Sequence, residues 1–220
     1  MIDVNHQINA VRRRVGSRVI EAGEGHVVTL SQTYDTTVED LWDACTNPER
    51  IPRWFLPVTG DLRVGGKYQL QGNANGTVES CDPPRGFTAT WEFAGDVTWI
   101  ELRLIPEADG GTRFELDHIA PDDDEKWAQF GPGAVGVGWD MALIGLTLHL
   151  STGEAVNPEE AMAWFGTEDG LRFVTLSSEA WYAASVSDGE AEGVARARAD
   201  RTTAAYTGAE VDAEGDTESG

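Results

Sequence analysis

The sequence predicts an α+β domain in which an antiparallel meander of strands curls around one long C-terminal helix. Between about residues 61 and 119, five short β-rich runs are separated by turn signals. Apolar residues alternate along these runs, so each predicted strand has one buried face and one wet face. Residues 134–150 then carry no charge except Asp140 and the titratable His149. A helix of this kind is buried on more than one side, and it supplies the apolar cover that a one-sided sheet requires.

The N-terminal segment is predicted to be a helical lead-in over residues 1–23. Its arginine run, residues 12–14, is expected either to pair with the abundant acids of the chain itself or to contact an acidic partner. Residues 24–35 alternate in β-rich fashion and predict the first strand.

Two short helices are predicted next. Thr36 or Thr37 can cap a helix over TTVEDLWDACTN, whose first turn carries Glu39 and Asp40 near the positive end of the helix dipole. Pro48 is expected to open the second helix, PERIPRWF.

The five runs of the meander are separated by turns. Asn75-Gly76 and the segment 109–111 are predicted hairpin turns. Strand parity predicts that one face is dry, formed by Phe87, Ala89, Trp91, Phe93, Ile100, Leu102, Leu104, Phe114, Leu116 and His118.

The chain beyond the long helix predicts a second helical layer. Asn157-Pro158 is a helix start, residues 167–187 continue in helical pattern, and a weaker helix should end at Gly208. We therefore expect a curled-sheet domain over residues 24–151, a helical extension over 152–208 and a disordered acidic tail over 209–220.

Charge and composition exclude several functions. Against 16 Lys and Arg stand 38 Asp and Glu, for a net charge of −22. Nucleic-acid binding needs a basic face, and an anionic membrane surface would repel this chain. No apolar run reaches the roughly 18 residues of a membrane span, so membrane insertion is not expected.

Cysteine usage predicts a reducing compartment. Cys45 and Cys81 lack the spacing of a disulfide framework or a zinc site, and the N-terminus does not read as a signal peptide. A cytoplasmic protein without metal or other cofactor is expected.

Several motifs resemble a known family. LWDACTNPERIPRWF, DLRVGGKY, GTVESCDPPRGFTATWEF and GTRFELDH, in this order, resemble the SRPBCC (START, helix-grip) superfamily, over about residues 26–150. Within it they look most like the branch of the activator of heat-shock-protein ATPase (AHSA-like). The resemblance implies a helix-grip fold, and the family includes carriers, polyketide cyclases and chaperone regulators.

A cavity between the curled sheet and the long helix is the candidate site. A sheet that curls around a helix leaves either a filled core or an apolar space of ligand size. The candidate lining residues are Trp54, Phe55, Tyr68, Trp91, Phe93, Leu102, Phe114, His118, Trp139 and Leu143.

Other residues permit two interpretations each. His118 and Tyr68 are weak catalytic candidates, as a general base and a ligand-orienting hydroxyl, but both are expected mainly as packing residues. Asp140 either starts the helix or binds a ligand or a partner arginine, with the helix start preferred. Cys45 is expected as a buried apolar filler.

These residues, together with what the resemblance implies, suggest three functions. The first is binding of a small hydrophobic or amphipathic molecule in the cavity. The second is a chaperone-interaction module that uses the outer face of the sheet and Trp99. The third is a cyclase-like enzyme that uses His118 with Tyr68.

Overall fold

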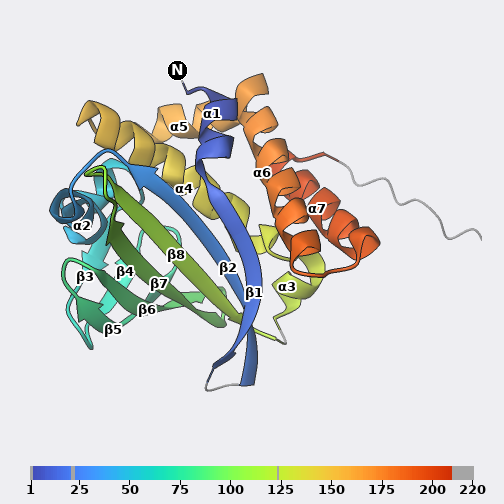
Figure 1. Ribbon diagram of the computed structural model, residues 1–220, viewed down its shortest axis with the longest axis horizontal. Helices are drawn as coiled ribbons and strands as arrows, with labels where there is room; N and C mark the ends of the chain where they lie inside the picture. Colours follow the sequence, from blue (N-terminus) through green and yellow to red (C-terminus); the bar gives the residue numbers. More distant parts are fainter. Residues whose placement is uncertain (1, 21–22, 123, 210–220) are drawn as a thin grey trace, which may run out of the picture.

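The computed structural model describes residues 2–20, 23–122 and 124–209, which form an eight-stranded antiparallel sheet and its helical cover (Figure 1). The strands are β1 Arg12–Ile20, β2 Gly23–Tyr34, β3 Val58–Gly60, β4 Lys67–Leu70, β5 Asn75–Asp82, β6 Gly86–Phe93, β7 Asp96–Pro106 and β8 Thr112–Pro121. The helices are α1 Val4–Ala10, α2 Val38–Thr46, α3 Glu125–Phe130, α4 Gly133–Thr152, α5 Pro158–Phe165, α6 Glu168–Ser187 and α7 Glu192–Thr207, with a 3-10 turn η1 at Ile51–Arg53.

The sheet order is β1-β2-β8-β7-β6-β5-β4-β3, so the first two strands lie beside the last one. Helix α4 packs against β2 and is covered in turn by α6 and α7, while α6 also reaches β1 and α1 (Figure 1). The predicted meander, long helix and outer helical layer are therefore confirmed, and the architecture is a helix-grip fold.

The N-terminal segment corrects the sequence expectation. The predicted helical lead-in holds only for α1, because residues 12–20 form a strand that pairs antiparallel with β2, with Val15 opposite Val28. Pairing satisfies the backbone groups that β2 would otherwise present as an open edge. Two of the three arginines pair with acids of the chain, since Arg13 turns inward to Asp140 and Arg14 outward to Glu115.

One predicted turn and one predicted helix also differ from the structure. Asn75-Gly76 is not a turn but the start of β5, where a side chain at Gly76 would collide with the carbonyl oxygen of Thr90 on β6. The helix expected from Pro48 shrinks to η1, and the short strand β3 was not predicted. The 109–111 turn is confirmed, with Gly110 at a φ of +94° and Glu107 N–H bonded to Gly111 O at 2.8 Å.

Strand parity predicts the dry face correctly in β7 and β8. The residues from Ile100 to Leu104 and from Phe114 to His118 with inward parity are all buried. In β6 the prediction weakens toward the hairpin, where Phe93 is 45% exposed.

Helix α4 is long and apolar enough to cross a membrane by length and composition alone, although Asp140, Thr147 and His149 interrupt its apolar residues. In this fold it packs between the sheet and the outer helices. Two of its glycines make that packing possible, because a side chain at Gly136 would collide with the ring of Trp181 and one at Gly145 with the backbone oxygen of Trp54.

A buried carboxylate ties the helical layers to the N-terminal strand. Asp140 lies in the second turn of α4 rather than at its start, so the preferred helix-start interpretation is wrong. Arg13 Nε and Nη2 each donate to its carboxylate at 2.9 Å, Ser177 Oγ donates at 2.6 Å and Trp181 Nε1 at 3.0 Å. The alternative, a partner arginine, is what the structure shows.

The predicted C-terminal helix start, caps and stop are confirmed. Asn157 accepts hydrogen bonds from the backbone of Glu159 and Glu160, and Gly208 ends α7 in the left-handed conformation. Almost all of the tail predicted over 209–220 lies outside the described residues.

Candidate functional site

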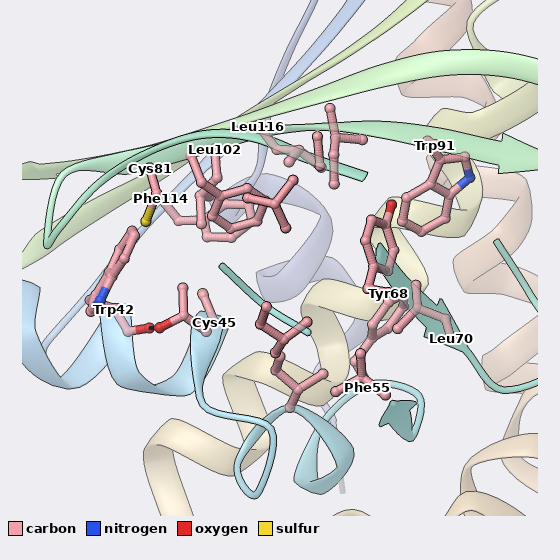
Figure 2. Close-up of a pocket in the computed structure, with 18 of the residues that line it drawn as sticks. Trp42, Cys45, Phe55, Tyr68, Leu70, Cys81, Trp91, Leu102, Phe114 and Leu116 are labelled. Carbon is pink, nitrogen blue, oxygen red and sulfur yellow. Dashed lines mark hydrogen bonds between the residues drawn. The ribbon is translucent and has the colours of Figure 1, made fainter. Parts of the chain in front are cut away.

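An apolar cavity of about 350 Å³ lies between the inner face of the sheet, α2 and the segment that follows it (Figure 2). Among the described residues, none of those lining it is charged. From the predicted set, the lining residues are Trp54, Phe55, Tyr68, Trp91, Leu102, Phe114 and Trp139.

The cavity is displaced from its expected position under the whole length of the long helix. Helix α4 contributes Trp139 alone, while Leu143, one turn further on, is sealed in the core at 1% exposure. The opposite wall comes from α2 and η1. In Figure 2, Trp42 of α2 and Cys81 of β5 lie toward one side of the cavity, and Tyr68 of β4 and Trp91 of β6 lie toward the other.

Helix α2 is positioned by local capping. Thr37 Oγ1 accepts a hydrogen bond from Asp40 N–H at 3.2 Å, and Glu39 and Asp40 occupy the first turn. Trp42, Cys45 and Thr46 then fall on one face at helical spacing and line the cavity. Burial raises the pKa of the Cys45 thiol to about 12, so it stays neutral and acts as an apolar wall atom.

The aromatic wall next to α4 is held by contacts between rings. Trp54 donates its Nε1–H to Ala44 O at 2.8 Å and stacks on Phe55, with ring centroids 5.4 Å apart. Phe55 in turn stacks on Trp139 at 5.9 Å, and Trp139 lies 5.0 Å from Trp91. The indole N–H groups of Trp54 and Trp139 donate to Ala44 O and His118 Nδ1, so these two residues present ring faces to a ligand.

Tyr68 brings the hydroxyl group of a tyrosine to the cavity lining. Its Oη donates to Thr90 O at 2.6 Å, and burial raises its pKa, so the phenol stays neutral. The oxygen retains lone pairs that can accept one hydrogen bond from a ligand.

A second pocket, of about 280 Å³, lies on the other side of the aromatic wall. It shares Phe55, Trp91 and Trp139 with the cavity and adds Phe93 and His118 from the predicted set. His118 and Tyr68 thus line different pockets, and the structure does not bring the two weak catalytic candidates together.

His118 is engaged on both ring nitrogens. Trp139 Nε1–H donates to its Nδ1 at 3.0 Å, so the proton sits on Nε2 and is donated to Thr98 Oγ1 at 2.9 Å, and Thr98 donates onward to Trp91 O. Burial lowers the pKa of His118 to about 3. A neutral histidine within a closed hydrogen-bond chain orients Trp139 and Thr98.

Several lining residues were missed by the sequence analysis. The α2 residues were readable from their helical spacing. Strand parity had already placed Phe87, Ala89, Ile100 and Leu116 on the inner face, but they were not included among the candidate lining residues. Cys81 was not readable from parity, because a register shift between Val78 and Ser80 changes which residues of β5 face inward.

An antiparallel sheet that grips a long helix and leaves an apolar cavity defines the helix-grip class of proteins, the SRPBCC superfamily. The family described as Activator of Hsp90 ATPase homolog 1-like protein matches residues 35–151, and the chain belongs to this family. No match was found among curated proteins.

Solved structures agree with this assignment. The crystal structure of CalU16 from Micromonospora echinospora is 41% identical over 76% of this chain and 98% of its own, with a TM-score of 0.59. The solution structure of CalU16 gives 38% identity over 82% and 97%, with a TM-score of 0.67. MLL2253 from Mesorhizobium loti, 20% identical over 57% of this chain and 96% of its own at a TM-score of 0.51, shares the fold.

Proposed function

We propose that this protein binds a small hydrophobic or amphipathic molecule in the cavity between the sheet, α2 and Trp139. The observation that carries the proposal is the cavity itself, with about 350 Å³ of space and a wall whose described residues are uncharged and include eight aromatic side chains among 20. Ligand pockets of this class are lined mainly by apolar and aromatic side chains and contain few polar groups.

The physical argument for binding is the free energy gained when a ligand removes the apolar wall of the cavity from water. Apolar surface gains about 25 cal/mol for each Å² removed from water. Rings such as Phe55 and Trp91 offer this surface with little conformational freedom left to lose, because neighbouring rings already fix them. The Tyr68 oxygen supplies one point of polar recognition, which accepts a ligand N–H or O–H group.

Binding is tested with the neutral dye N-phenyl-1-naphthylamine, whose emission rises in apolar surroundings. The wild-type chain should bind it at one site, and Ala89→Leu, which places a larger side chain in the cavity, should weaken binding at least about tenfold. Val78→Phe fills the same cavity from β5 and should also weaken binding, so the test does not depend on the correct folding of Ala89→Leu alone. Ala163→Leu, the same enlargement on exposed helix α5, is the matched control and should bind as the wild type does.

A second readout uses Cys81, which lines the cavity yet is exposed. Bound dye should slow alkylation of Cys81 in the wild type and leave it unchanged in Ala89→Leu. Absence of saturable dye binding, or equal binding by the filled variants, contradicts the proposal.

A chaperone-interaction module is the second candidate, favoured by the family to which the chain belongs. Its surface would be the outer face of the sheet around the half-buried Trp99. Stimulation of the ATPase of the cognate chaperone by the wild type, lost in Trp99→Ala, would support it. A cytoplasmic location belongs to both proposals, and the two free cysteines fit a reducing compartment.

A further inference from the structure

The second pocket carries a chemistry that the apolar cavity does not. Beside the rings of Phe93, Trp127 and Tyr206 it is lined by Asp96, Asp124 and Lys126. Burial keeps His118 neutral at physiological pH, so that residue adds no positive charge. Among the residues that the structure describes, the lining therefore holds two carboxylates against one ammonium group.

That ammonium group occupies a site built for a cation. Lys126 Nζ lies 2.5 Å from Asp96 Oδ2 and 5.3 Å from the centroid of the Phe93 ring. A carboxylate and the face of an aromatic ring are the two partners that attract an ammonium group. Both partners belong to the β6–β7 hairpin, so the site exists without Lys126.

Lys126 is held there weakly. Its side chain is 44% exposed and that of Asp96 is 51% exposed, and ion pairs between such exposed groups contribute little net stability. The lysine can swing into water on its flexible stem and leave the carboxylate and the ring to another cation.

Exposed apolar side chains at the rim of the second pocket favour a competing cation that carries an apolar body. Phe93 is 45% exposed and Tyr206 39%, and both line the pocket, while Val97 on the same hairpin is 44% exposed. Deeper in, the pocket reaches the rings of Trp91 and Trp139. A molecule with an apolar body gains burial here that a lysine side chain, tethered at α3, cannot gain.

We propose that the second pocket binds an amphipathic cation, an aromatic or aliphatic ammonium compound, whose charged group displaces Lys126 from Asp96 and Phe93. This site shares the wall of Phe55, Trp91 and Trp139 with the apolar cavity, but its cation-binding groups, Asp96 and Phe93, do not line that cavity, and it does not require the cavity to be filled. Its occupant is recognised by charge, whereas the cavity accepts an uncharged body.

The test compares three probes that share one ring system: 2-(1-naphthyl)ethylamine, 2-(1-naphthyl)ethanol and 1-naphthaleneacetate. Isothermal titration calorimetry at pH 7 should show the amine binding about three- to tenfold more tightly than the alcohol, and the acetate more weakly than either. The preference should fall at high salt, because both charges lie near the surface.

Variants then assign the preference to the site. Asp96→Asn should lower the affinity for the amine about three- to tenfold and leave the alcohol unchanged. Lys126→Ala should raise the affinity for the amine, because it removes the internal competitor.

The matched control is Asp200→Asn. Asp200 also pairs with a cation that lies over an aromatic ring. Arg196 Nε is 3.4 Å from Asp200 Oδ1, and Arg196 Cζ is 4.2 Å from the centroid of the Tyr182 ring. Asp200 lines neither of the two pockets, so this change of the same net charge should leave amine binding as in the wild type.

Several outcomes overturn the proposal. Tighter binding of the acetate, with loss in Lys126→Ala, would show that the lysine recruits an anion. Equal affinities for all three probes, or failure of the amine to bind, would show a site without cation recognition. Retained binding of N-phenyl-1-naphthylamine in the same experiments would leave the cavity proposal standing, so the two proposals fail separately.

Discussion

The buried ion pair between Arg13 and Asp140 provides the sharpest test of how the chain is held together. Their side chains are 5% and 0% exposed, and the carboxylate also receives hydrogen bonds from α6. Asp140→Asn keeps the shape of the side chain and leaves the guanidinium of Arg13 buried without a counter-charge. Breaking a buried pair by removal of one partner costs about 3–5 kcal/mol.

The corresponding change in melting temperature follows from chain length. For a domain of this size each kcal/mol shifts the midpoint by about 2–4 °C, so Asp140→Asn should melt about 6–20 °C below the wild type. Equilibrium urea unfolding, followed by circular dichroism, measures the free energy directly. The double variant Arg13→Met with Asp140→Asn should lose less free energy of unfolding than the sum of the losses in the two single variants, because it leaves no unpaired buried charge.

The control is the exposed pair of Arg63 and Asp61, with side chains 82% and 48% exposed. Arg63→Ala should change the free energy of unfolding by less than about 1 kcal/mol. If Asp140→Asn also cost less than 1 kcal/mol, or if the effects of the two single variants simply added, the pair would not tie β1 and α6 to α4 and the reasoning would be refuted.

Three further predictions concern single side chains. Because the pKa of His118 is lowered to about 3, the unfolded state binds a proton more readily than the folded state below pH 6.5, and stability is lost as pH falls. Relative to His118→Gln, the wild type should lose about 2 kcal/mol of unfolding free energy between pH 7 and pH 5. Parallel pH profiles of the two proteins would contradict this prediction. Gly145→Ala should destabilise by about 1–3 kcal/mol in urea unfolding because the added carbon meets a backbone oxygen, whereas Gly193→Ala, with open space around it, should stabilise by up to about 1 kcal/mol. Iodoacetamide at pH 8 should modify Cys81 well before Cys45, which is buried and has a pKa of about 12; equal rates in peptide mass spectra would show that the α2 wall is open.

The sheet and its long helix could be predicted from sequence because their signals are periodic and local. Alternation placed the inward residues of β7 and β8, and caps such as Thr37 and Asn157 marked helix starts. Strand β1 was missed because a run of three arginines carries no burial signal of its own. Its register depends on a partner strand and on Asp140, which is 127 positions away in the sequence.

The candidate site was predictable in composition and not in shape. Parity identified Leu102, Phe114 and Trp91 as inward-facing, but parity cannot tell which inward residues border empty space and which are packed, as Leu143 is. The division into two pockets depends on how Phe55 and Trp139 stack across a loop and a helix, and that contact has no local sequence signal.

The central claim, that the cavity holds a small apolar molecule, is tested most directly by native mass spectrometry of the protein purified from its own host. The wild type and Ala163→Leu should carry one co-purifying molecule per chain, and Ala89→Leu should have lost it. A wild-type chain without bound mass, or a bound mass that persists in Ala89→Leu, would contradict the account.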